Sequence, residues 1–496
     1  MREIEPKIIG TTFDDFMLRP QHAKGRRSDI TNLKTKLTKK IWLNLPIVSA
    51  NMDTVTEHQT AICLARNGGL GFIHRNMSIG RQAREVEKVK RADNFVIEKP
   101  YTIGEFSNIH EAKEIMDKNG VRSLVVVSKE GKLRGILTHR DIKFMDDHGK
   151  KSNLLVCMRM VSIESEKLIY HKGSVETPDE AMLLLDKYRV KKIPLVDEGM
   201  MVVGLITSKD IEKLMLHPYA NKDANGRLRV AAAIGVKGDF LERARELKNS
   251  GVDVLLMDIA HGDSETMKKG IEQFRKKFDN FELIAGNIAT GLGADFLKDM
   301  GVNGIKIGIG PGKGCETRLS TSAGVGQVEA IRSAYLAVSD DGIPLIADGG
   351  VNYNKDICIA LAFGASSVML GSKLGGTDES PGRIITKRVI NEQGKAEERK
   401  FKIYRGMTSP EAKLANEDEL SEGTARPTHI EGRQEEIPYQ GGSVEEILVG
   451  IRESLQSFVS YAGEETLEEV RRKISLSPMN YYSRITLATQ KESKFI

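Results

Sequence analysis

The chain has 496 residues, with 74 lysines and arginines against 69 aspartates and glutamates, and four well-separated cysteines. The length exceeds one ordinary domain, and the net charge of +5 is spread along the chain, which argues against a dedicated nucleic-acid-binding protein. The cysteines lack metal-binding spacing, and no apolar run approaches the ~18 residues of a membrane-spanning helix. These features predict a cytoplasmic protein that does not associate with membranes.

Short apolar runs alternate with amphipathic stretches through residues 1–96 and 216–496. The runs are continuously apolar, which is typical of parallel strands that are buried on both faces. The eight runs lie at residues 45–52, 69–74, 229–235, 252–260, 281–289, 304–310, 343–350 and 366–372. They predict an α/β fold with a (β/α)8 TIM barrel; a doubly wound sheet is the alternative, because strand order cannot be read from the sequence.

Residues 97–215 interrupt the barrel pattern with an internal repeat. The stretch AKEIMDKNGVRSLVVV at 112–127 returns as AMLLLDKYRVKKIPLV at 181–196, and each copy predicts a helix, a strand, a turn, a second strand and a helix. This pattern resembles an inserted tandem pair of CBS domains, a module that often binds adenine or guanine nucleotides. The resemblance implies a regulatory ATP or GTP site; the alternative is a module that only spaces or dimerises the protein.

Polar residues or glycines close the apolar runs, where a barrel of this type carries its chemistry. They are Asn51, Asp53, Asp258, Asn287, Gly310, Asp348 and Gly371. Asp348 closes a buried strand before two glycines, so its carboxylate could accept both hydroxyls of a ribose; the alternative is a helix N-cap. Gly371 and Ser372 follow the last run and are predicted to offer backbone amides to a phosphate.

The glycine-rich stretch GIGPGKGCETR at 308–318 follows the sixth run. Its spacing matches neither a dinucleotide fingerprint nor a Walker motif. Its glycines leave amides free to face an anion and carbonyls free to face a cation. Cys315 ends the loop beside Lys313 and Arg318, whose charges are expected to lower the pKa of the thiol and favour a nucleophilic thiolate. The alternative is a buried and inert cysteine.

Residues 373–442, which we call the flap, break the alternation of strands and helices. GRIITKRVINEQGKAEERKF at 382–401 is typical of a charged hairpin, and the residues after it are polar and weakly periodic. A long excursion after the last strand is where a mobile lid over the site would lie, and plain disorder is the alternative.

Six ordered motifs resemble the IMP dehydrogenase/GMP reductase family over nearly the whole chain. They are TTFDDFMLRP (11–20), SANMDTVTE (49–57), GGLGFIHRNMS (68–78), GIGPGKGCETR (308–318), LIADGGV (345–351) and YRGMTS (404–409). The resemblance implies a barrel enzyme, a homotetramer or octamer, that binds GMP or IMP. It also implies a covalent adduct between the loop cysteine and purine C2, with hydride transfer between C2 and NAD or NADP.

The resemblance also implies roles for residues of this chain. Cys315 resembles the nucleophile, and Thr317 resembles its neighbour that acts on water or ammonia. The residues implied to hold the purine nucleotide are Met52, Asp348, Gly350, Gly371, Ser372, Tyr404 and Met407. Asp258 and Asn287 resemble residues on the nicotinamide side. The backbone carbonyls that match potassium ligands of dehydrogenases are those of Gly310, Gly312 and Cys315.

The flap favours the reductase activity. Dehydrogenases of the family activate water with an Arg-Tyr pair on the flap, and no Arg-Tyr dipeptide occurs in the 496 residues. EGRQEEIPYQGG at 431–442 matches the reductase pattern, and Thr428 stands where dehydrogenases usually have Glu or Gln. In a reductase, Thr317 together with Glu379 of the stretch TDESPG is expected to handle the proton that ammonia takes.

Other features resemble dehydrogenases or depart from both activities. TVTEHQ (54–59) and GFIHRNMS (71–78) resemble dehydrogenase sequence, Arg75 replaces a common lysine, and Lys313 and Glu316 replace small or hydroxyl residues. We expect GMP reductase first, with NADPH or NADH as cofactor, and IMP dehydrogenase second. A nucleotide-sensing regulator without turnover is a third alternative, against which the retained catalytic motifs argue.

Overall fold

The structure is a computed structural model that describes residues 3–93, 95–143, 154–165, 167–175, 177–390, 394–414, 430–439 and 441–493. Its residues form two compact units. The first comprises residues 1–92, 219–223 and 228–496, and the second comprises residues 93–218 and 224–227. The second unit therefore contains the internal repeat, for which the sequence predicted a module at 97–215.

Eight parallel strands form the centre of the first unit. In their order around the sheet they are β4 (Ile47–Ser49), β19 (Ser367–Leu370), β18 (Leu345–Asp348), β17 (Gly304–Ile307), β16 (Leu283–Ile288), β15 (Val254–Asp258), β14 (Ala231–Ile234) and β5 (Phe72–Ile73). A parallel bridge between Val48 and Leu70 joins the two ends of the sheet into a barrel. Because strands that are adjacent in the barrel follow one another in the sequence, the order is that of a TIM barrel and excludes the doubly wound alternative.

Each predicted apolar run contains one of these strands, which confirms the barrel prediction. All residues of β14, β17 and β19 are buried, as expected for strands covered on both faces. One hydrophobic cluster fills the barrel interior, and a larger one lies between the strands and the helices. The hairpin of β2 (Thr35–Lys36) and β3 (Trp42–Leu43) closes the N-terminal end of the barrel, where Leu37 lies among the interior residues.

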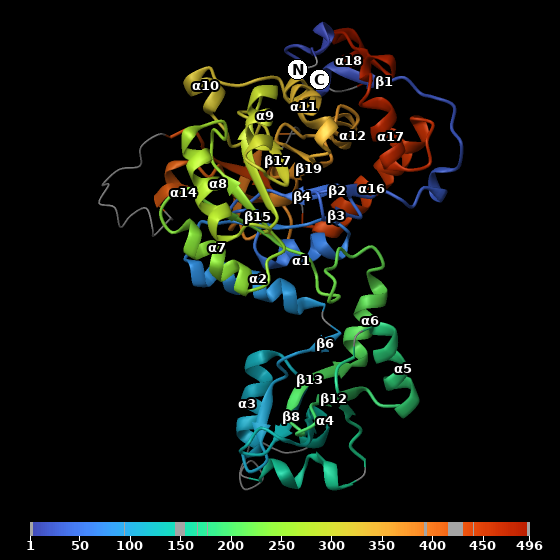
Figure 1. The fold of residues 1–496 in the computed structure, drawn as a ribbon, viewed down its shortest axis with the longest axis vertical. Coiled ribbons are helices and arrows are strands. Elements are labelled where there is room, and N and C mark those ends of the chain that lie inside the picture. The colour runs from blue at the N-terminus through green and yellow to red at the C-terminus, as the bar shows by residue number, and fades with distance from the viewer. Residues whose placement is uncertain are drawn as a thin grey trace. The chain divides into compact units, whose positions relative to one another are not determined.

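Helices surround the strands of the barrel (Figure 1). In chain order they are α1 (His58–Arg66), α2 (Ile79–Ala92), α7 (Phe240–Asn249), α8 (Glu265–Lys277), α9 (Gly291–Asp299), α10 (Thr317–Thr321), α11 (Gln327–Val338), α12 (Asn354–Ala362), α13 (Ser372–Gly375) and α16 (Val444–Tyr461). Capping fixes where some of them begin: the Thr290 hydroxyl accepts a hydrogen bond from the Gly293 amide at 3.1 Å at the start of α9. None of the helices in the described part of the chain is long and apolar enough to cross a membrane.

The flap contains a three-stranded antiparallel sheet. Its strands, in order, are β20 (Ile384–Ile390), β21 (Ala396–Arg405) and β22 (Gln434–Pro438). β20 and β21 form the charged hairpin that the sequence predicted at 382–401, and the short helix α14 (Pro410–Leu414) follows β21. Residues 415–429, which include Thr428, lie outside the described residues, so the mobility of the flap stays a prediction.

Segments from the two ends of the chain meet beside the barrel. β1 (Phe16–Leu18) pairs antiparallel with β23 (Tyr482–Arg484). The rings of Phe16 and Tyr482 pack on Phe363 with centroids 4.9 and 5.2 Å away. The remaining elements of this unit are η1 (Pro6–Ile8), η2 (Phe13–Asp15), η3 (Arg27–Asp29), η6 (Ser339–Asp341), α17 (Leu467–Ile474), η7 (Pro478–Asn480) and α18 (Leu487–Glu492).

The second unit consists of two halves with the same order of elements. The first half contains β7 (Thr102–Gly104), α3 (Ile109–Asn119), β8 (Ser123–Val127), β9 (Leu133–Thr138) and α4 (His139–Ile142), and the second contains β11 (His171–Lys172), α5 (Pro178–Tyr188), β12 (Lys192–Val196), β13 (Val202–Thr207) and α6 (Ser208–Leu216). The other elements are β6 (Val96–Ile97), η4 (Val156–Met158), β10 (Val161–Ser162) and η5 (Ile163–Ser165). The helix–strand–strand–helix order predicted from the repeat is present in both halves, while their assignment as CBS domains stays a prediction.

Candidate active site

A cavity of about 590 Å³ lies at the C-terminal ends of the barrel strands. Residues at the ends of β4, β5, β15, β16, β17, β18 and β19 line it, together with flap residues 404 and 406–408. The volume falls within the usual range for small-molecule sites. TIM barrels carry their active sites on this face, so the cavity is the candidate active site.

A thiol, a hydroxyl and a carboxylate form a chain of hydrogen bonds at the cavity. The Cys315 Sγ donates to Thr317 Oγ1 at 3.3 Å, and Thr317 Oγ1 donates to Glu431 Oε2 at 2.8 Å. The direction of the donors leads from the thiol to an acceptor carboxylate. This arrangement provides a route by which the thiol proton can leave and a proton can later return.

Backbone hydrogen bonds hold the cysteine loop against residues 431–433, which directly precede β22 of the flap. The Glu316 amide donates to the Glu431 carbonyl at 2.8 Å, and the Arg433 amide donates to the Gly314 carbonyl at 3.1 Å. Cys315 and Gly432 form an antiparallel bridge between these contacts. Main-chain atoms therefore fix the Cys315 backbone relative to that of Glu431, whose carboxylate faces Thr317.

Arg318 holds the shape of the glycine-rich loop. Its guanidinium donates to the carbonyls of Ile309 and Val325. A Cβ on Gly310 would lie only 2.4 Å from Arg318 Cγ, and Gly310 has a φ of +85°, so both the space and the backbone conformation require glycine. Arg318 was expected to act on the thiol, but its hydrogen bonds go to loop carbonyls.

The other cysteines are in different surroundings. Burial raises the pKa of the Cys63 thiol to about 12, with a further contribution from Glu379, and burial raises the pKa of Cys358 to about 12 as well. Both thiols stay protonated near neutral pH. Cys157 belongs to the second unit, and Cys315 lines the cavity.

A buried lysine joins two carboxylates in the cavity wall. Lys306 Nζ lies 2.7 Å from Asp348 Oδ2 and 3.1 Å from Asp258 Oδ1, and the lysine side chain is 3% exposed. Burial acts to lower the pKa of Lys306, but the carboxylates of Asp258 and Asp348 outweigh it, so the pKa is raised and the lysine stays charged. The lysine therefore fixes both carboxylates in position.

Asn287 adds an unpaired acceptor to the same wall. Its Nδ2 donates to the Gly308 carbonyl at 2.7 Å and to Asp348 Oδ2 at 2.9 Å. Its Oδ1 is buried and has no hydrogen-bond partner among the described residues. A buried acceptor without a partner is costly, so this atom is suited to accept a hydrogen bond from a ligand amide.

A buried tyrosine connects the flap to the barrel strands. The Tyr404 hydroxyl donates to Met52 Sδ at 3.5 Å. A Cβ on Gly371 would lie 2.6 Å from the same hydroxyl, so a side chain at 371 would displace the ring. Burial raises the pKa of Tyr404, with a further contribution from Asp348. The phenol therefore stays neutral and forms part of the cavity wall.

Comparison with known proteins identifies the family. The IMP dehydrogenase/GMP reductase domain matches residues 10–495, which is nearly the whole chain. The chain belongs to this family. It is accordingly an NAD(P)-dependent oxidoreductase of purine metabolism, as the sequence motifs implied.

Relatives of both activities are similar to this chain. Inosine-5'-monophosphate dehydrogenase of Nitrosopumilus maritimus is 42% identical over 481 residues, covering 95% of this chain and 96% of that protein. The structure of a Trypanosoma brucei GMP reductase in complex with guanosine 5'-monophosphate matches with a TM-score of 0.87 at 35% identity, covering 98% of this chain and 97% of that chain. The same reductase in complex with guanosine 5'-triphosphate matches with a TM-score of 0.78 at 32% identity, covering 96% and 98%. The comparisons therefore show the family without separating its two activities.

Nearly all residues predicted from the family motifs lie in one place. Those that line the cavity are Met52, Asp258, Asn287, Gly310, Gly312, Cys315, Thr317, Asp348, Gly350, Gly371, Ser372, Tyr404 and Met407. The Asp348 carboxylate is bonded to side chains of Asn287 and Lys306 rather than capping a helix. The individual roles of these residues in the family reaction stay predictions.

Glu379 was predicted to be catalytic, but it lies outside the cavity. Its carboxylate accepts hydrogen bonds from the Ser443 hydroxyl and, at 2.9 Å, from the Val444 amide at the start of α16. It does not line the cavity. Glu379 therefore stabilises a helix N-terminus in this arrangement, and the acidic partner of Thr317 is Glu431 instead.

Two site residues of this family member were missed from the sequence. Lys306 lies inside an apolar run, and the sequence around it does not indicate that its side chain contacts Asp258 and Asp348. Glu431 opens EGRQEEIPYQGG, which was used only as a pattern. Its contact with Thr317 depends on pairing across more than a hundred residues, which no local signal reports.

One carbonyl of the predicted potassium site already accepts a hydrogen bond. The Gly312 carbonyl accepts a hydrogen bond from the Cys315 amide at 3.0 Å, so one of the predicted ligands is already engaged within the loop. A carbonyl oxygen has a second lone pair, so this contact leaves potassium binding by the carbonyls of Gly310, Gly312 and Cys315 a prediction.

Proposed function

We propose that the protein is a GMP reductase, which converts GMP and NADPH or NADH to IMP, ammonia and the oxidised cofactor. The observation that supports this most strongly is the chain of hydrogen bonds from Cys315 through Thr317 to Glu431. The chain can deliver a proton to a leaving amine. The sequence also lacks the Arg-Tyr pair expected of a water-activating dehydrogenase flap.

The cavity offers complementary groups to a purine nucleotide. Asp348, held by Lys306, is suited to accept the ribose hydroxyls. Backbone amides of Gly350, Gly371 and Ser372, which follow the seventh and eighth barrel strands, are suited to bind the 5'-phosphate. The residues proposed to hold the base over the nucleophile are Met52, Tyr404 and Met407.

The proposed reaction begins with removal of the amino group. The sulfur of Cys315 attacks purine C2 and forms a C–S bond, while the thiol proton passes through Thr317 to Glu431. The C2–N bond to the amino group then breaks, and the same proton returns through Thr317, so that the amino group leaves as ammonia. The product of this half-reaction is a thioimidate between the cysteine and the purine.

The second half-reaction reduces C2. The reduced nicotinamide, when bound, supplies a hydride to C2. The C–S bond then breaks with its electron pair on sulfur, which regenerates Cys315 after protonation and releases IMP. Asn287 Oδ1, a buried acceptor that no described residue satisfies, and Asp258 are suited to orient the carboxamide and ribose of the cofactor.

IMP dehydrogenase is the second candidate, because curated relatives with that name are similar over 95% of this chain. In that reaction the hydride leaves C2 first, and water must then hydrolyse the thioimidate. Glu431 would have to activate that water through Thr317, since the sequence contains no Arg-Tyr dipeptide. The two candidates therefore differ in the group that is exchanged at C2. In the reductase the amino group leaves as ammonia, and in the dehydrogenase a water molecule attacks the thioimidate.

Ammonia stoichiometry tests the proposal. Purified protein given GMP and NADPH is expected to release one ammonia for each NADPH oxidised. Cys315→Ala is expected to release none, because without the C–S bond C2 does not become reactive. Turnover that persists in Cys315→Ala would refute the covalent route.

The partners and assembly remain part of the proposal. We infer that the second unit binds ATP or GTP, which is supported by the internal repeat; a Trypanosoma brucei relative has been solved in complex with guanosine 5'-triphosphate. A homotetramer or octamer is expected from the family resemblance, and size measurement in solution would distinguish these states from a monomer.

A further inference from the structure

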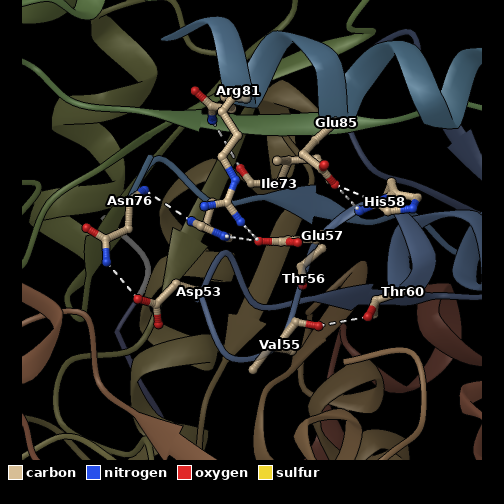
Figure 2. A network of polar contacts seen from close by, with 12 residues as sticks. Asp53, Val55, Thr56, Glu57, His58, Thr60, Ile73, Asn76, Arg81 and Glu85 are labelled. Carbon is tan, nitrogen blue, oxygen red and sulfur yellow. Dashed lines mark hydrogen bonds and ion pairs between the residues drawn. The ribbon is translucent and has the colours of Figure 1, made fainter. Parts of the chain in front are cut away.

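Asp53 forms a junction between three segments that surround the cavity. Its side chain is 6% exposed. Arg405 Nε donates to Asp53 Oδ1 and Oδ2 at 3.1 Å each, and Arg405 Nη2 donates to Oδ2. Asn76 Nδ2 donates to Oδ2 at 2.6 Å, and Figure 2 shows the two side chains pointing toward each other. We call Asp53, Asn76 and Arg405 the Asp53 junction.

Each member of the junction adjoins a residue of the cavity wall. The residues immediately before Asp53, Asn76 and Arg405 are Met52, Arg75 and Tyr404, and all three line the cavity. They come from the loop after β4, the loop after β5 and the flap strand β21, which are separate segments of the chain. The junction itself does not line the cavity, so it acts on ligands only through these neighbours.

The junction also reaches the proton route through the flap sheet. Arg405 pairs with Gln434 in the ladder of β21 and β22, and the Gly406 amide donates to the Arg433 carbonyl at 3.1 Å. These backbone contacts lead directly to Glu431, two residues before Arg433. Fixing Arg405 on the barrel therefore fixes the strand that presents Glu431 to Thr317.

We propose that Asp53 is a positioning residue that holds the flap in register with the barrel, so that Tyr404 and Glu431 meet the nucleotide and Thr317. The inference rests on the proposed reaction at this cavity and assigns no chemical step to Asp53. Removing one partner of a buried ion pair leaves the other charge uncompensated, so Arg405 would shift to reach water. Small displacements of catalytic groups can lower rates by about a hundredfold.

The phosphate and ribose contacts should be insensitive to the junction. They come from the ends of β18 and β19, whereas the junction ties the loops after β4 and β5 to the flap. The inference therefore predicts a split between turnover and nucleotide affinity. A general loss of stability would produce no such split.

Asp53→Asn tests this, with Glu5→Gln as a matched control. Glu5 also forms a two-pronged pair with a buried arginine, Arg332, but it does not line the cavity. We expect Asp53→Asn to lower kcat about ten- to hundredfold. The dissociation constant of GMP, measured by calorimetry, should rise by a smaller factor, because the ribose and phosphate contacts are kept and only the base contacts shift. We expect Glu5→Gln to lower thermal stability without lowering kcat. An unchanged kcat in Asp53→Asn, or an equal loss in Glu5→Gln, would overturn the inference.

Arg405→Lys keeps the inference testable if Asp53→Asn does not fold. Lysine keeps the charge but cannot make the two-pronged contact, so a smaller fall in kcat is expected, again with a smaller effect on GMP affinity than on kcat. In the double variant the two effects should not add, because both break the same contact. Additive effects would contradict the junction. If the wild-type protein instead converts IMP with NAD, the proposed function fails, and the same variants measured on that reaction still decide the inference.

Discussion

Two glutamates at the start and the end of the flap have different surroundings, and this difference distinguishes their roles. Glu431 accepts a hydrogen bond from Thr317 at 2.8 Å, whereas Glu379 accepts from the Val444 amide at the start of α16. Only Glu431 is linked to the cysteine. Of the two glutamates, Glu431 is therefore the one placed to exchange a proton with Thr317.

Substituting each glutamate by glutamine distinguishes a role in proton transfer from a role in stability. Glu431→Gln is expected to lower kcat about 10²- to 10⁴-fold, because an amide cannot take and return the proton. Glu379→Gln is expected to keep kcat and to lower the unfolding free energy by about 0.5–2 kcal/mol through a weaker helix cap. Steady-state kinetics and thermal unfolding of both variants check this. Equal loss of kcat in the two variants would contradict the assignment.

Lys313 adds a cation to the cavity wall. It lines the cavity in the loop whose Pro311 and Gly312 pack on Gly349, next to the proposed phosphate position. Lys313→Ser is expected to raise the KM for GMP about tenfold with kcat unchanged, since a hydrogen bond to a charged group contributes about 1.5–3 kcal/mol. Lys276→Ser, on the exposed face of α8, is the control and should leave KM unchanged. An equal rise in both variants would contradict a phosphate contact.

The sequence predicted the site residues that sit in recognisable motifs and failed where a role depends on tertiary contacts. Cys315 and Asp348 follow apolar runs, so the strand-end rule found them. Glu379 was assigned to proton transfer from the reductase resemblance, but its carboxylate faces a helix N-terminus. Lys306 was missed because a single charge in an apolar run does not reveal which groups surround it.

At the scale of elements, a buried carboxylate ties α1 to α2. His58 Nδ1 lies 2.6 Å from Glu85 Oε2, and the His58 amide also donates to this carboxylate (Figure 2). Lys88 Nζ donates to Glu85 Oε1 at 2.7 Å. Burial acts to raise the pKa of Glu85, but the hydrogen bonds from His58 and Lys88 lower it from 4.5 to about 2. Because the pKa is lower in the folded protein, this contribution to stability is present above pH 4.5 and is lost as the pH falls toward 2.

Glu85→Gln measures this contribution. At pH 7 the variant is expected to be less stable than the wild type by about 1–2 kcal/mol, and the difference should shrink as the pH falls below 4.5. Urea unfolding of both proteins at a series of pH values checks the sign. A difference that stays constant with pH would contradict the role of the charged carboxylate.

The eight barrel strands could be predicted because each is buried on both faces and therefore appears in the sequence as a continuous apolar run. The hairpin of β20 and β21 was also predicted, since its two strands are adjacent in sequence. The pairing of β1 with β23 was not, because it joins short segments from opposite ends of the chain. The third flap strand, β22, was missed for the same reason: it pairs with β21 across residues 406–433.

At the scale of the whole molecule, the cavity and the internal repeat belong to different units. We expect ATP or GTP to change the activity or the assembly state of the full chain. Deleting residues 97–215 is expected to remove that response and leave the basal kcat unchanged, since the cavity residues belong to the first unit. Initial rates with and without each nucleotide check this. A response that survives the deletion would contradict a regulatory site in the second unit.

The direction of hydride transfer is the central claim, and parallel assays of both substrate pairs test it most directly. One assay supplies GMP with NADPH or NADH, and the other supplies IMP with NAD. Our account predicts cofactor oxidation and ammonia release in the first assay and no XMP in the second. Formation of XMP from IMP, with no oxidation of either reduced cofactor in the presence of GMP, would contradict it.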